Sequence, residues 1–344
     1  MSTATATSTA TFASALNTAM SDAMEADESV VVFGEDVGTL GGVFRITDGL
    51  TKRFGTNRCF DTPLAESGIA GTAVGMAING MRPVIEMQFD AFAYPALEQV
   101  FSHIAKMANR TRGRVRLPMV IRIPYGGGVG GVEHHCDSSE AYYAHTAGLK
   151  VFTPATVADA YLMLREAIDT EDPVVFFEPK KLYWSKADDD LSTLREAYES
   201  GTESSRLVGA QGQAVVVREG TDVSIISYGP SVSTAVKAAE AAAEDGISAE
   251  VLDMRSVVPF DEVALVRTVE KTGRAVVVAE AQGFVSVASE ITARIQERCF
   301  HSLASPVLRV TGFDIPYPAP KLEEHHLPDV NRILDALDEL QWED

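Results

Sequence analysis

A carboxylate near the start of a run of small and apolar residues is the first candidate for chemistry in this chain. The segment from Asp61 to Gly68 reads Asp-Thr-Pro-Leu-Ala-Glu-Ser-Gly. Thr62 can serve as a helix N-cap and Pro63 suits the first helical position, so a helix is expected to open there. Glu66 then falls one residue too late for a capping box, which leaves its carboxylate without the commonest local role.

The expected helix is rich in glycine. Gly68, Gly71 and Gly75 each cost about 1 kcal/mol relative to alanine in a helix interior. Glycines at that cost usually allow another backbone or a ligand to approach closely. Two interpretations follow: a tight helix–helix contact in which the helix dipole favours Glu66, or a ligand site that uses this carboxyl group.

Imidazole, thiol and carboxyl groups gather after a second glycine-rich segment. This segment runs from Tyr125 to Gly131 and follows an apolar strand. It lacks the Lys-Ser or Lys-Thr pair of a P-loop, so it is expected to shape an active-site entrance. The group that follows comprises His134, His135, Cys136, Asp137 and His145. Adjacent histidines cannot easily share one tetrahedral site, so the spacing argues against zinc.

The residues around Glu66 resemble a known family. Asp-Thr-Pro-Leu-Ala-Glu-Ser-Gly-Ile-Ala-Gly is followed by Arg82-Pro83-Val84 and by Glu86-Met87-Gln88-Phe89. This pattern is similar to the beta subunit of the thiamine-diphosphate-dependent 2-oxoacid dehydrogenases, within the transketolase-like superfamily, and the similarity extends over nearly the whole chain. The resemblance implies an enzyme that decarboxylates a 2-oxoacid oxidatively and passes the acyl group to a lipoyl group of an acyltransferase.

The resemblance also implies roles for single residues. Glu66 would meet the aminopyrimidine ring of thiamine diphosphate as a catalytic carboxyl group, and Leu64, Gln88 and Phe92 would line the pyrimidine pocket with it. His135 would transfer a proton when the acyl group passes to the lipoyl arm. Asp137 follows Cys136 where the family usually has Ser-Gln. Asp137 is expected either to raise the proton affinity of His135 or to replace an amide contact.

The chain has no recognisable site for the diphosphate end of the cofactor. That end is bound through a metal ion, and its usual signature begins with Gly-Asp-Gly, which this sequence does not contain. The resemblance implies that a separate alpha subunit holds Mg²⁺, that each active site forms between alpha and beta chains, and that the assembly is an α2β2 heterotetramer. The helix face at Gly71 and Gly75 is then expected to pack closely in that assembly. A structural potassium ion is expected near Ala167, Ile168 and Asp172, which match a segment that holds this ion in some relatives.

The sequence leaves alternatives open for the substrate and for the class of function. The segments 140–145 and 177–183 look more like the branched-chain enzyme than the pyruvate enzyme, so branched-chain 2-oxoacids are the first expectation and pyruvate the second. One methylene in a pocket discriminates by only ~1–3 kcal/mol. A sugar transferase made of split halves would need basic residues near the entrance, and Arg112, Arg114 and Arg116 form the only local cluster. A non-catalytic assembly subunit would need neither Glu66 nor His135.

Composition excludes other classes of protein. The 344 residues are 46% hydrophobic, which suits about two globular domains. The net charge of −20 argues against a nucleic-acid partner and favours solubility or a basic partner surface. No apolar run approaches the ~20 residues of a membrane span. Residues 1–11 lack the features of a signal peptide, and the three widely spaced cysteines indicate reduced thiols, so a cytoplasmic protein is expected.

Alternating apolar strands and amphipathic helices predict the fold class. Strands are expected at 30–33, 83–89, 119–124, 150–154 and 173–178, and again at 223–228, 249–254, 275–280 and 307–310. Helices are expected at 11–27, 94–110, 156–170, 231–245, 261–271, 285–298 and 328–340. This order predicts an α/β protein of the transketolase-like class with two parallel-sheet domains. Residues 1–10 are expected to be disordered, 11–184 to form a pyrimidine-binding domain, 185–213 a linker and 214–344 a C-terminal domain.

Overall fold

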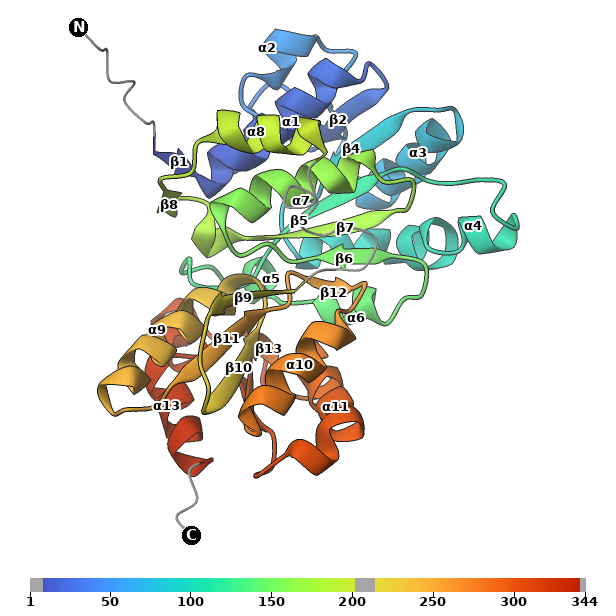
Figure 1. Cartoon of the computed structure of the whole chain (residues 1–344). Helices are drawn as coiled ribbons and strands as arrows, with labels where there is room; N and C mark the ends of the chain where they lie inside the picture. The colour runs from blue at the N-terminus through green and yellow to red at the C-terminus, as the bar shows by residue number, and fades with distance from the viewer. Residues whose placement is uncertain (1–8, 202–213, 341–344) are drawn as a thin grey trace, which may run out of the picture.

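The computed structural model describes residues 9–201 and 214–340 and consists of two α/β units, which lie one above the other in Figure 1. The upper unit is built on a seven-stranded sheet and the lower unit on a five-stranded sheet. Most of the N-terminus that was expected to be disordered, residues 1–8, lies outside the described residues, as do residues 202–213 of the expected linker.

The seven-stranded sheet has the order β12-β6-β7-β5-β4-β2-β3. The strands are β2 (Val30–Gly34), β3 (Cys59–Asp61), β4 (Arg82–Glu86), β5 (Val120–Tyr125), β6 (Lys150–Phe152), β7 (Val174–Pro179) and β12 (Ser256–Val258). β2, β5 and β7 are buried along their whole length, which explains their continuous apolar runs. Every neighbouring pair except β12–β6 is parallel, so the expected parallel α/β architecture is confirmed.

Helices cover both faces of this sheet. α1 (Phe12–Ala26) and α7 (Val157–Asp169) pack against each other and share one buried cluster with β2 and β7. α3 (Glu66–Ile78) contributes its buried residues to a second cluster on the opposite face. α3 thus places its first residue, Glu66, near the edge at which β2 and β4 end.

The five-stranded sheet has the order β14-β13-β10-β11-β9. The strands are β9 (Val215–Arg218), β10 (Val223–Ser227), β11 (Ala249–Asp253), β13 (Ala275–Gln282) and β14 (Leu308–Gly312). β9 is antiparallel to β11 and the other pairs are parallel. One face is covered by α9 (Val232–Glu244) and α13 (Val330–Glu339), the other by α10 (Glu262–Thr272) and α11 (Val287–Cys299).

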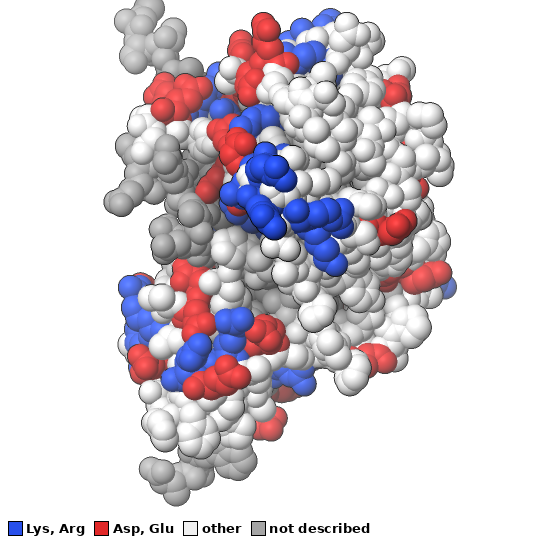
Figure 2. Space-filling view, turned by 90° about the vertical axis from the view of Figure 1, so that its right-hand side faces the viewer, with Lys and Arg blue, Asp and Glu red and all other residues white. Residues whose placement is uncertain are grey.

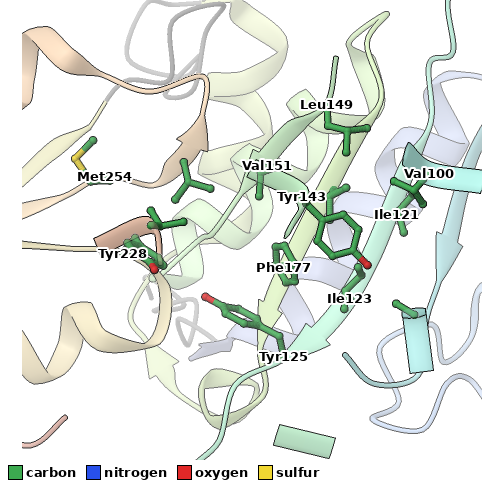
Figure 3. Packing of buried hydrophobic residues seen from close by; sticks show 14 of the residues in the cluster. Val100, Ile121, Ile123, Tyr125, Tyr143, Leu149, Val151, Phe177, Tyr228 and Met254 are labelled. Atoms are coloured by element: carbon green, nitrogen blue, oxygen red, sulfur yellow. The ribbon is translucent and has the colours of Figure 1, made fainter. Parts of the chain in front are cut away.

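One strand and one buried cluster join the two units. β12 lies between β11 and β13 of the second unit in the sequence but pairs with β6 of the first unit. Figure 3 shows that Tyr125 and Phe177 of the first unit lie in the same cluster as Tyr228 and Met254 of the second. The hydroxyl of Tyr228 also donates to Glu140 at 2.7 Å. The two units therefore share a core, and either unit can fix groups that the other carries.

Two expected helices differ from those observed. The helix expected from Pro63 begins at Glu66, because the backbone N–H of Thr62 donates to Gly34 at 2.9 Å and keeps Thr62 extended beside β2. The helix expected at 94–110 is divided into a 3₁₀ turn η1 (Ala91–Ala96), a π turn η2 (Gln99–Ile104) and α4 (Met107–Arg110). Pro95 lies in the first of these turns and has no N–H to donate, which disfavours a continuous α-helix.

The described part of the expected linker is folded. β8 (Lys186–Ala187) pairs with β1 (Ala10–Thr11), and α8 (Leu191–Ser200) packs on α7. Tyr198 of α8 donates to Asp169 of α7 at 2.6 Å. The remaining short elements are α2 (Leu50–Phe54), α5 (Glu133–Cys136), α6 (Glu140–Ala144), η3 (Lys180–Leu182), η5 (Gly229–Ser231), η6 (Phe300–Ser302), η7 (Pro320–Leu322) and α12 (Glu323–His326).

Candidate active site

The candidate site lies where parallel strands of the first sheet end. β2 ends at Gly34 and leads directly into Glu35. β4 ends at Glu86, two residues before Gln88, and β5 ends at Tyr125, where the glycine-rich loop begins. Because the carboxyl ends of parallel strands meet at one edge of a sheet, the topology gathers these groups in one place.

Two carboxyl groups lie close enough at this edge for the charge of one to act on the other. Glu66 is half-buried at the start of α3. Glu35 is buried, and its pKa is raised, first by burial and then by the negative charge of Glu66. Glu35 accepts from the backbone N–H of Ala65, whereas its Oε1 has no hydrogen-bond partner among the described residues. Because buried polar atoms are nearly always satisfied, this oxygen beside a second carboxyl group indicates a ligand-binding position.

Nothing in the sequence pattern singled out Glu35 except its place directly after a buried strand. The other expected pocket residues are arranged around the same edge. Gln88 donates from Nε2 to Asp36 at 3.1 Å, so it lies beside the residue that follows Glu35. Leu64 is 79% exposed, so its side chain projects away from the core of the chain.

His135 lies on α5 within a group of aromatic rings. Its ring centroid is 4.3 Å from that of Phe89 and 5.3 Å from that of Phe92. Burial lowers the pKa of His135, and the positive charges of His134 and Lys180 lower it further. The imidazole is therefore neutral near pH 7. The structure thus brings His135, Phe89 and Phe92 together, and the roles of His135 and Phe92 stay predictions.

Asp137 has a hydrogen-bond partner other than His135. The pKa of His135 is lowered and Asp137 is not among the charges that shift it, so the expectation that Asp137 raises the proton affinity of this imidazole gains no support. The carboxylate of Asp137 instead accepts from the hydroxyl of Tyr94 at 2.9 Å. Asp137 therefore ties the end of α5 to η1.

The other candidate groups in this segment have structural positions. Cys136 is 1% exposed, and burial raises the pKa of its thiol to about 11, so it stays protonated and unreactive. His134 is exposed and lies 3.5 Å from Glu133, and His145 is also exposed. Across residues 9–201 and 214–340, no three histidine, cysteine, aspartate or glutamate side chains are placed to hold a metal ion.

A buried polar layer lies close to His135 and had no sequence signature. Lys180 is 2% exposed, its Nζ has no hydrogen-bond partner within the described chain, and burial lowers its pKa to about 8. Burial raises the pKa of the neighbouring Asp90 to about 7. Asp90 accepts from the backbone N–H of Ser139 at 3.0 Å and from its hydroxyl at 2.5 Å. The Asp90–Ser139 hydrogen bonds join the start of η1 to the start of α6.

The segment considered for potassium is already occupied by cationic side chains. Ala167 is fully buried in α7. The carbonyl oxygen of Ile168 accepts from Arg82 at 3.0 Å. The carboxylate of Asp172 pairs with Arg116 at 3.1 Å and with Lys150 at 3.4 Å. These oxygens are the ligands that an alkali cation would need, so the segment in this arrangement does not fit the ion.

Comparison with known proteins places the chain in a family. The model "Transketolase, pyrimidine binding domain" matches residues 8–185, and "Transketolase, C-terminal domain" matches residues 212–333. The chain is 51% identical over 324 residues to the pyruvate dehydrogenase E1 component subunit beta of Leifsonia xyli subsp. xyli, covering 94% of this chain and 92% of that protein. It is 48% identical over 333 residues to the 3-methyl-2-oxobutanoate dehydrogenase subunit beta of Mycobacterium tuberculosis, covering 96% and 92%.

A solved structure described as "Split gene transketolase, inactive beta4 tetramer" has the same fold, with a TM-score of 0.74 over 96% of this chain and 97% of that chain. Its sequence identity is 21%, so this likeness concerns the fold alone. The sugar-transferase alternative therefore gains nothing beyond the shared architecture. With its two transketolase-type domains and its relatives at about half identity, the chain belongs to the family of thiamine-diphosphate-dependent 2-oxoacid dehydrogenase E1 beta subunits.

Proposed function

We propose that this chain is the beta subunit of the decarboxylating component of a branched-chain 2-oxoacid dehydrogenase complex. In this role it completes, with an alpha subunit, a site for oxidative decarboxylation of a 2-oxoacid and for acyl transfer to a lipoyl group. The observation that carries the proposal is the carboxyl pair Glu35–Glu66 with its unpartnered buried oxygen.

The carboxyl pair fits the pyrimidine end of thiamine diphosphate. An aminopyrimidine offers a ring nitrogen and an amino group, which suit one protonated and one free carboxyl group. Glu66 would bind the ring nitrogen, and the free Oε1 of Glu35 would accept from the amino group. Gln88, Phe92 and Leu64 would form the wall of this pocket, and Leu64 would reach across to the partner chain.

The chain's own residues have separable tasks. When bound, thiamine diphosphate supplies a carbanion and takes up the electron pair that decarboxylation leaves. Glu66 would bind the pyrimidine ring nitrogen through its carboxyl group, beside Glu35, whose pKa is raised by burial and by the negative charge of Glu66. His135 moves a proton at its imidazole during transfer to the lipoyl group, and Phe89 and Phe92 keep water from one side of its ring.

An alpha subunit is needed for the diphosphate end and for Mg²⁺. Figure 2 shows the face of the chain that carries α3 and α4: a compact group of basic side chains adjoins a broad area with few charges. α3 exposes Ile78, and a side chain added at Gly75 would meet nothing within 4 Å inside this chain. This bare helix face supports close packing against another subunit in an α2β2 heterotetramer.

The proposed function also implies an acyltransferase partner and a cellular location. The acyl group passes to the lipoyl arm of an acyltransferase core. The three cysteines, Cys59, Cys136 and Cys299, are all buried free thiols, which supports a reducing, cytoplasmic location. No helix within the described residues is long and apolar enough to cross a membrane. Potassium is left out of the proposal, because cationic side chains already bind the oxygens near Asp172.

The proposed function has two versions, which differ in the 2-oxoacid that serves as substrate. Relatives of comparable identity are named for 3-methyl-2-oxobutanoate and for pyruvate. The test is turnover of a panel of 2-oxoacids by the complex that co-purifies with this chain from its native source, with thiamine diphosphate, Mg²⁺ and an artificial electron acceptor. We expect 3-methyl-2-oxobutanoate to be turned over far faster than pyruvate. Preference for pyruvate would assign the second substrate, and no turnover with a second subunit present would reject the enzymatic proposal.

A further inference from the structure

The glycine-rich loop beside the site is bound by carboxylates from the other domain. Among the loop residues 126–131, the backbone N–H of Gly128 donates to Glu323 Oε1 at 2.7 Å, and that of Gly130 donates to Glu323 Oε2 at 3.1 Å. The N–H of Gly127 donates to Glu280 Oε1. A loop of this kind can form a nest for an anion. Here the anions are side chains of β13 and α12, more than 150 residues away in sequence.

Glu323 is held rigidly in this position. It is 8% exposed, and its Oε1 also accepts from the hydroxyl of Tyr317 at 2.6 Å. The same hydroxyl lies against the loop, because a Cβ placed on Gly127 would be 1.8 Å from it. Both oxygens of Glu323 thus have defined partners, and charge-assisted hydrogen bonds of this kind are stronger than neutral ones.

A second contact fixes the other side of the loop. Glu280 Oε2 pairs with Lys181 at 3.2 Å, and the aliphatic part of Lys181 lies against Gly128. A Cβ on Gly128 would be 3.1 Å from Lys181 Cδ. Gly128 also has a φ of +80°, a conformation that side chains rarely adopt. The loop therefore has little freedom between the two domains.

The loop is continuous with the helix that carries His135. The N–H of Gly126, at the start of the loop, donates to the carbonyl oxygen of Asp137 at 2.9 Å. At the other end, a Cβ on Gly131 would be 2.7 Å from the sulfur of Cys136. The loop and α5 thus form one closed unit, and a shift of the loop would move His135 relative to Phe92.

We propose that Glu323, supported by Tyr317, is a positioning residue that fixes the loop 126–131 and thereby the imidazole of His135 for acyl transfer. This inference rests on the role of His135 given under Proposed function. Glu323 does not itself touch the reacting groups. Through this contact the C-terminal domain contributes to a step that occurs at the edge of the first sheet. Glu280 and Glu323 accept hydrogen bonds from backbone N–H groups that would bind water if the loop were mobile.

The test uses the assembled complex with Glu323→Gln. An amide keeps the size of the side chain but can no longer accept from both Gly128 and Gly130, because one arm becomes a donor. The matched control is Glu324→Gln, the exposed neighbouring glutamate. Tyr317→Phe is a second variant that removes only the hydroxyl. Three quantities are measured: decarboxylation with an artificial acceptor, acylation of a free lipoyl domain, and amide hydrogen exchange of residues 126–131.

We expect Glu323→Gln to speed amide hydrogen exchange at residues 128 and 130 by about tenfold. This is the effect of losing one hydrogen bond to a charged group. Lipoyl acylation should fall by about tenfold, decarboxylation should change less than twofold, and Tyr317→Phe should show a smaller effect of the same kind. Unchanged exchange, or unchanged acylation despite faster exchange, would overturn the proposal. His135→Ala is run in parallel: if it does not affect acylation selectively, the assigned role of His135 fails, whereas the exchange result still decides whether Glu323 fixes the loop.

Discussion

At the scale of single residues, the candidate site combines carboxyl groups from different elements, since Glu35 follows β2 and Glu66 begins α3. Glu66 and Glu35 are 31 positions apart, yet the charge of one affects the pKa of the other. A carboxyl pair of this kind holds a proton more readily than two separate groups do. This is the property that a site for an aminopyrimidine requires.

The role of Glu66 leads to a direct prediction. Glu66→Gln should lower decarboxylation by roughly 100-fold or more, because positioned proton transfer contributes 10²–10⁴-fold to catalysis. Assembly with the alpha subunit should persist, since this side chain is only half-buried. The measurement is 2-oxoacid-dependent reduction of an artificial acceptor, with the exposed Glu98→Gln as control. Near-normal turnover would remove Glu66 from the mechanism.

The lowered pKa of His135 predicts a pH dependence. Burial and the nearby positive charges disfavour the charged imidazole, so protonation occurs below the ordinary value of 6.5. Acylation of the lipoyl domain should therefore stay level around pH 7 and decline only as the pH falls below 6.5. His135→Ala should reduce acylation more than decarboxylation and abolish this decline, whereas the exposed His134→Ala should keep it. A midpoint above pH 6.5 would contradict the assignment.

At the scale of elements, β5 supplies both the core of the sheet and the loop that leads to His135. Arg122 in the middle of β5 is fully buried and pairs with Glu86 of β4 and Glu178 of β7, each at 2.7 Å. Tyr183 donates to the same Glu178 at 2.7 Å. These contacts align three neighbouring strands just below the edge where the site lies.

Removal of this buried cation should destabilise the first unit. Arg122→Met leaves two buried carboxylates without a cationic partner, and breaking a buried pair in this way costs about 3–5 kcal/mol. We expect a loss of this size in the free energy of unfolding, measured by urea titration of the complex. The surface control Arg267→Met on α10 should change it by less than about 0.5 kcal/mol. Equal stability of both variants would show that the pairs are not needed.

At the scale of the whole molecule, the second unit contributes directly to the structure of the first. β12 extends the sheet of the first unit, and Glu280 and Glu323 bind its glycine-rich loop. The two units therefore act as one body at the site. Arg82 donates to the carbonyl oxygen of Ile168 at the end of α7, and Arg116 and Lys150 pair with Asp172, which follows this helix.

The complex should not gain stability from potassium through this chain. Melting temperatures of the complex are compared in potassium chloride and choline chloride at equal ionic strength, for the unaltered protein and for Asp172→Asn. Because Asp172 already pairs with two cationic side chains, any increment due to potassium should be the same in both proteins. A potassium-specific increment that Asp172→Asn removes would place the ion in this segment.

Much of the fold followed from local sequence. The apolar runs of β2, β5 and β7 predicted buried parallel strands, because a strand covered on both faces needs apolar residues at every position. Two helices begin where Thr11 and Thr156 accept from backbone N–H groups of the first turn. The prediction of one continuous helix at 94–110 was wrong. Whether Pro95 interrupts the helix depends on how the surrounding chain packs against it. Glu66, Gln88, Phe92 and His135 were found through resemblance to a family, and their roles stay predictions.

The sequence by itself determined the fold class and the groups able to do chemistry, since periodicity and residue type are local properties. The tertiary structure alone decided which of these groups meet. It brought Glu35 close to Glu66 and lowered the pKa of His135. It also placed carboxylates of the C-terminal domain where they accept hydrogen bonds from the loop 126–131. Contacts between residues 31 to 195 positions apart depend on how strands pair and how helices pack, and no short stretch of sequence contains that information.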